Sequence, residues 1–168
     1  MNERRASISL GERWRREANR GIDDKMLERA LTTLPSIRQS MVKVRPGAIR
    51  AEIEGAIGSI HETAIHVAPL QQKYMEQLAR VLHRSRSILE ALQQGRVPRS
   101  FDRLVARICG EPLFPEPRRI SSACTCNEPE RPCHHILAVH ELFARRLEDK
   151  PWELILLRGI ELPKLLMA

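Results

Sequence analysis

One twelve-residue segment of the chain reads Cys124-Thr125-Cys126-Asn127-Glu128-Pro129-Glu130-Arg131-Pro132-Cys133-His134-His135, and it holds three of the four cysteines and two of the six histidines. Zinc in structural sites takes four thiolate or imidazole ligands in a tetrahedron. Residues two apart on a strand point to one face, so a Cys-x-Cys pair can direct both sulfurs at the same point. We therefore predict a structural zinc site formed by Cys124, Cys126, Cys133 and His135, with His134 as the competing ligand.

The alternative interpretation is that these cysteines are small buried hydrophobic residues, which is common for a single cysteine. The segment between Cys124 and His135 contains no strongly apolar residue. Three cysteines beside two histidines are therefore difficult to bury without a metal ion. Cys109 lies outside the segment, next to Ile108 on an apolar helix face, and we expect it to be a core residue.

A helix is expected directly after the cysteine segment. Ile136, Val139, Phe143 and Leu147 recur at steps of three and four residues, which is the spacing of an amphipathic helix. Cys133 then lies near the N-terminus of this helix, a position that favours the thiolate form of a cysteine.

Upstream of the segment, the pattern of apolar residues changes from helix to strand and back to helix. Residues 42–45 and 49–54 alternate apolar and charged side chains on either side of Pro46-Gly47, which predicts a β-hairpin. A third strand is expected over residues 63–67, and helical spacing occupies most of residues 74–108. The sequence thus predicts an α+β fold with an N-terminal helix, a β-hairpin or small antiparallel sheet, and a helical middle. We expect three parts, a basic N-terminal arm (1–20), an α+β body (21–117) and a C-terminal zinc-binding module (118–168).

The charge of the chain is uneven along its length. The 168 residues have a formal net charge of +7, and residues 1–50 hold 12 Lys or Arg against 6 Asp or Glu. Basic arms neutralise nucleic-acid phosphates, so we predict nucleic-acid contact by Arg4, Arg5, Arg13, Arg15, Arg16 and Arg20. The alternative is a solvated leader without a partner. The sequence shows neither a membrane-spanning run nor a secretory signal, and we expect a cytoplasmic protein.

The order Cys-x-Cys, six residues, Cys-x-His resembles the SWIM-type zinc finger, found in SNF2-family ATPases, transposases and plant and bacterial proteins. The close resemblance covers residues 123–159 and includes Leu157-Arg158-Gly159, similar to an Arg-Gly pair that closes bacterial members. A looser likeness to small bacterial SWIM-finger proteins extends upstream to Trp14-Arg15-Arg16 and the hairpin. The resemblance implies a ββα finger around one zinc ion in residues 118–168, with roles in DNA binding and protein–protein contact. It also implies activity beside an SNF2-type helicase.

These features favour a non-catalytic module that binds macromolecules. Four protein ligands leave no open position on zinc for a reacting water, and the chain has no Walker-type, Gly-x-Ser-x-Gly or Gly-x-Gly-x-x-Gly motif. We therefore expect no enzymatic activity and no small-molecule substrate; a zinc hydrolase is a distant third reading. A pure protein–protein adaptor remains the main alternative, because Glu128 and Glu130 make the finger loop poorly suited to DNA.

Overall fold

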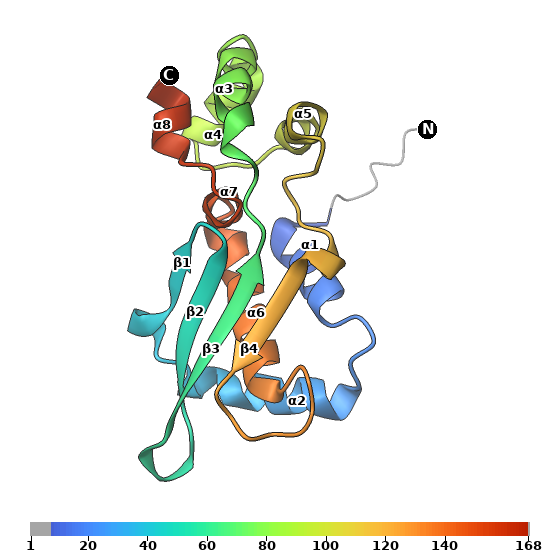
Figure 1. The fold of residues 1–168 in the computed structure, drawn as a ribbon, viewed down its shortest axis with the longest axis vertical. Helices are drawn as coiled ribbons and strands as arrows, with labels where there is room; N and C mark the ends of the chain where they lie inside the picture. Colours follow the sequence, from blue (N-terminus) through green and yellow to red (C-terminus); the bar gives the residue numbers. More distant parts are fainter. Residues whose placement is uncertain (1–7, 168) are drawn as a thin grey trace.

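The computed structural model describes residues 8–167, which form a four-stranded antiparallel sheet and helices that cover one of its faces (Figure 1). The strands β1 (Lys43–Arg45), β2 (Ala48–Glu54), β3 (Ile60–Val67) and β4 (Ile120–Cys124) lie in the order β1-β2-β3-β4. Gly47, at φ +80°, takes the turn position between β1 and β2 that favours glycine. The predicted α+β class, hairpin and third strand are confirmed.

The central helix is α6 (His134–Asp149), which packs on β3 and β4 and runs behind the sheet in Figure 1. Helices α1 (Leu10–Ala18) and α2 (Asp24–Thr33) also pack on α6. Ten of the sixteen residues of α6 are buried, more than the single apolar face of an amphipathic helix would supply. The reason is that α6 packs against the sheet and also against α1 and α2.

The remaining helices lie at the end of the molecule opposite α2, at the top of Figure 1. They are α3 (Met75–His83), α4 (Arg86–Gln93), α5 (Arg99–Cys109), α7 (Trp152–Leu157) and α8 (Leu162–Met167). Helix α3 contacts α4, α5 and α8, while α7 contacts β1 and α6. The helical middle predicted from spacing is therefore confirmed.

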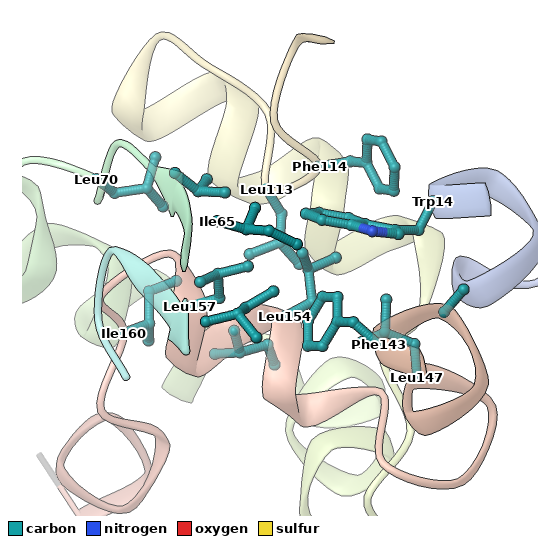
Figure 2. Close-up of a cluster of buried hydrophobic side chains, with 14 of the residues drawn as sticks. Trp14, Ile65, Leu70, Leu113, Phe114, Phe143, Leu147, Leu154, Leu157 and Ile160 are labelled. Carbon is teal, nitrogen blue, oxygen red and sulfur yellow. The ribbon is translucent and has the colours of Figure 1, made fainter. Parts of the chain in front are cut away.

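Most buried apolar side chains form a single cluster, with members from Trp14 to Leu165. Trp14 is only 1% exposed. The indole ring meets Phe114 and Phe143 edge-on, and Figure 2 shows it between these two rings. Helix α1 is thus anchored although it lies in the predicted arm, and residues 1–7, with Arg4 and Arg5, fall outside the described part. One core draws side chains from all three predicted parts. The division at residues 20 and 117 stays a prediction.

Helix α1 approaches α6 closely at Gly11. A Cβ atom there would overlap the carbonyl oxygen of Ala144 and the carboxylate of Glu148. We expect Gly11→Ala to lower the free energy of unfolding by about 1–3 kcal/mol, because overpacking outweighs the better helix propensity of alanine. Urea denaturation measures the change, with Arg16→Ala on the exposed face of α1 as the control. Equal stability of Gly11→Ala and the wild type would contradict the close packing of α1.

The buried His140 makes stability depend on pH. Its Nδ1 accepts a hydrogen bond from Nε1 of Trp14 at 3.1 Å, and burial lowers its pKa to about 4. The unfolded chain, with an ordinary histidine pKa near 6.5, binds this proton more tightly. Stability therefore falls as the pH drops from about 6.5 to 4, by roughly 2 kcal/mol between pH 7.5 and pH 5.

His140→Gln removes the titrating group and retains an acceptor for Trp14. We expect the stability of this variant to fall less over the same pH range than that of the wild type. Urea denaturation of both proteins at pH 7.5 and pH 5 gives the difference. Identical pH dependence in the two proteins would contradict the assignment to His140.

Candidate metal centre

The structure brings together the four residues predicted to bind zinc. Cys124 ends β4, Cys126 lies in the turn after it, Cys133 is the N-cap of α6, and His135 lies in its first turn. One sulfur or nitrogen atom from each residue lies within 4.8 Å of all the others. Donors around a tetrahedral zinc with bonds near 2.3 Å are about 3.8 Å apart. The cluster therefore needs only a slight contraction to enclose such an ion.

The donor set also fits a metal by its chemistry. All three sulfurs of the cluster belong to free cysteines, although they lie close together. Thiolate and imidazole are the ligands that zinc prefers in structural sites. Cys126, Cys133 and His135 are buried and Cys124 is partly buried. The cluster is thus largely removed from water, which a closed structural site requires.

Backbone pairing with β3 positions the Cys-x-Cys turn. Cys124 lies opposite Thr63, whose hydroxyl donates to Sγ of Cys124 at 3.4 Å. Thr125 continues the ladder, because its N–H donates to the carbonyl of Glu62 and its hydroxyl accepts from the N–H of Glu62. These contacts with β3 fix the positions of Cys124 and Thr125, and they thereby orient the Cys-x-Cys turn.

The loop between the two ligand pairs is held by Arg131. Its guanidinium donates to the carbonyl oxygens of Cys126, Glu128 and Glu130. These hydrogen bonds satisfy loop carbonyls that have no strand partner. Arg131 thus holds the loop in a compact turn that leads directly to Cys133.

The pKa values of Cys126, Cys133 and His135 are all shifted from their ordinary values. Burial and the neighbouring sulfurs raise the pKa of Cys133 to about 12, whereas the backbone N–H of Glu128 and the neighbouring thiols lower that of Cys126 against the effect of burial. Burial, His134 and His61 lower the pKa of His135 to about 4. His135 is therefore neutral at physiological pH, and neutral imidazole is the form that binds a metal. Thiolate charge in this cluster requires a compensating cation.

His134, the competing ligand, has a different partner. Its Nδ1 lies 2.9 Å from a carboxylate oxygen of Glu128, whose other oxygen accepts from Arg29 of α2 at 2.7 Å. The imidazole of His134 is not among the four converging donors. It connects the finger loop to α2, a link that spacing along the chain did not indicate.

His61, on β3, lies beside the cluster although it is not one of the four converging residues. Its ring centre is 4.7 Å from that of His135. The alternation of the strand indicates this position, because His61 is two and four residues from the buried Thr63 and Ile65 of β3 and so faces the same side. It therefore belongs to the inner face of the sheet.

Most of the described arginines predicted to contact nucleic acid are engaged within the fold. Arg13 lies 3.5 Å from Asp102 and stacks over the ring of Phe114. Arg15 pairs with Glu12 and Glu141, and Arg20 pairs with Glu17. Arg16 is exposed. Nucleic-acid contact by these residues stays a prediction, and for Arg13, Arg15 and Arg20 it would require breaking internal ion pairs.

Fold and site together define an α+β protein with a Cys3His cluster that could hold a metal ion, which is compatible with a zinc finger. Comparison of the chain with models of protein families, with curated proteins and with solved structures found no match. None of the described helices combines the length and the apolar character that crossing a bilayer demands.

Proposed function

We propose that Cys124, Cys126, Cys133 and His135 bind one zinc ion, and that the protein is a non-catalytic, SWIM-type module that binds other macromolecules. The convergence of four donor atoms within 4.8 Å of one another carries this proposal. Three sulfurs and one nitrogen match the ligands of structural zinc sites. The resemblance of the motif to the SWIM finger supports the class of module.

The position of the cluster supports a structural role for the metal. The four residues connect the end of β4, the loop and the first turn of the central helix α6. A site with four protein ligands leaves no position for a reacting water molecule. Zinc would therefore stabilise the junction between the sheet and α6, and we propose no catalysis at this centre.

The proposed partners are DNA and proteins, including an SNF2-type helicase as implied by the SWIM resemblance. A pure protein adaptor is the second candidate, and the ion pairs of Arg13, Arg15 and Arg20 favour it over DNA binding by α1. An apolar groove between α4, α7 and α8 is also consistent with protein contact. Trp152 and Met167 on this groove are 40% and 79% exposed.

Native mass spectrometry tests the metal, and X-ray absorption at the zinc edge tests its ligands. We expect one zinc ion per chain, surrounded by three sulfurs and one nitrogen. A folded protein without metal would overturn the proposal. An oxygen ligand in place of one protein donor would instead indicate an open, catalytic site.

A further inference from the structure

Helix α5 carries three arginines on one exposed face. Arg99, Arg103 and Arg107 are four residues apart, so their side chains leave the same side of the helix. All three are exposed, and no carboxylate of residues 8–167 lies within ion-pair distance of them. The opposite face of α5 is buried in the core through Phe101, Leu104 and Val105. We call Arg99, Arg103 and Arg107 the α5 arginine row.

This arrangement does not stabilise the helix. Like charges four residues apart repel one another, and a cation in the first turn opposes the helix dipole. The one carboxylate of α5, Asp102, accepts from the backbone N–H of Leu113 and lies near Arg13. The row therefore has no internal partner that would explain it, and its charge is available to an external anion.

The row lies within a strongly basic stretch of the described chain. Residues 80–109 contain seven arginines and only two carboxylates, Glu90 and Asp102. Glu90 pairs with Arg86, and Asp102 is engaged as described above. The surface of this region is thus suited to a polyanion.

We propose that the α5 arginine row binds the phosphate backbone of duplex DNA. Eight residues of helix rise about 12 Å, so the three arginines are spread over about that length along one side of α5. Duplex DNA presents one phosphate per roughly 1.7 Å of its axis, and guanidinium binds phosphate through paired hydrogen bonds. The inference rests on the proposed function in one respect, namely that the protein acts by binding a macromolecule.

Residues 75–109 carry no exposed Phe, Tyr or Trp, which favours a duplex over a single strand. Proteins that bind single strands stack bases on exposed aromatic side chains. Phe101 is the one aromatic residue of residues 75–109, and it is completely buried. Contacts to phosphates alone carry no sequence information. The binding is therefore expected to be independent of DNA sequence and strongly dependent on salt.

Fluorescence anisotropy of a labelled 20-base-pair duplex tests the proposal. We expect the triple variant R99Q/R103Q/R107Q to bind at least about tenfold more weakly than the wild type at low salt. Its slope of log affinity against log salt should be smaller by about 2–3, since each lost phosphate contact removes roughly 0.9. Glutamine retains good helix propensity, and circular dichroism checks the fold. The single variant R103Q is expected to lose about threefold.

The control variant K43Q/R45Q/R50Q removes the same charge from the outer face of the sheet. These three residues are exposed on β1 and β2, and no carboxylate of the described chain pairs with them. We expect this variant to lose less than threefold in affinity. Equal losses in both triple variants would overturn the assignment to α5, because they would indicate general electrostatic attraction.

Three further outcomes would overturn the inference. They are no duplex binding by the wild type at low salt, unchanged binding by R99Q/R103Q/R107Q, and tighter binding of a single-stranded DNA or RNA of the same length. Zinc content is measured on the same samples by native mass spectrometry. Zinc-loaded protein that does not bind DNA would refute this inference and DNA as a partner but leave the metal site and the protein adaptor standing, whereas DNA binding by a folded, zinc-free wild type would refute only the metal site.

Discussion

Cys126→Ser is expected to lose its zinc and to unfold the junction between β4 and α6. Serine does not replace a thiolate as a zinc ligand, and structural zinc contributes about 10–16 kcal/mol of binding free energy to small zinc-binding folds. That figure is comparable with the whole stability of a domain. Native mass spectrometry should show a metal-free chain, and hydrogen exchange should show loss of protection over residues 119–137.

Two matched variants separate this loss from ordinary core damage. Cys109→Ser changes a buried cysteine outside the cluster and should retain zinc, with a loss of about 1–3 kcal/mol for the buried hydroxyl. His134→Gln should also retain zinc, whereas His135→Gln should not, which decides between the two histidines. Retention of zinc by Cys126→Ser would contradict the four-ligand site.

Arg158→Met is expected to lower the free energy of unfolding by about 3–5 kcal/mol. Arg158 is completely buried, and its guanidinium donates to the carbonyls of Ala68 and Pro112 and to the carboxylate of Glu111. It thereby connects three segments, namely the end of α7, the chain after β3 and the loop after α5. Methionine fills similar volume but leaves the carbonyls of Ala68 and Pro112 without this donor and removes one of the cationic partners of Glu111.

Thermal unfolding measures the effect as a fall in Tm of roughly 6–20 °C for a chain of this length. Arg145→Met is the control, because Arg145 is exposed and its pair with Glu141 is expected to contribute less than about 1 kcal/mol. Arg158→Lys should also be destabilised, since a single ammonium group cannot reach all three acceptors in the same way. A stability of Arg158→Met within 1 kcal/mol of the wild type would refute the structural role.

The strands were predictable because their pattern is local. Ile49, Ala51 and Ile53 alternate with charged residues, and the two-residue period of a strand determines which side chains face the core. The Pro46-Gly47 turn then sets the hairpin register between adjacent segments. Likewise, Cys124 and Cys126 are close in the chain, so their common direction follows from local geometry.

The partners of these elements were not predictable in the same way. β4 pairs with β3, about sixty residues earlier in the chain, and this pairing brings His61 and Thr63 to the metal cluster. Trp14 reaches the core through contacts with Phe114 and Phe143, whereas its sequence neighbours are charged. Such contacts depend on how distant segments meet, and nothing in the local period of either segment specifies that meeting.

The sequence alone therefore determined the α+β class, the hairpin and the composition of the candidate metal cluster, because each depends on spacings of a few residues. Tertiary structure alone decided that His134 faces Glu128, that Arg13 and Arg15 form internal ion pairs, and that Arg158 is buried. The reason is physical: charge and burial of a side chain depend on its neighbours in space. Those neighbours come from segments that are far apart in the chain.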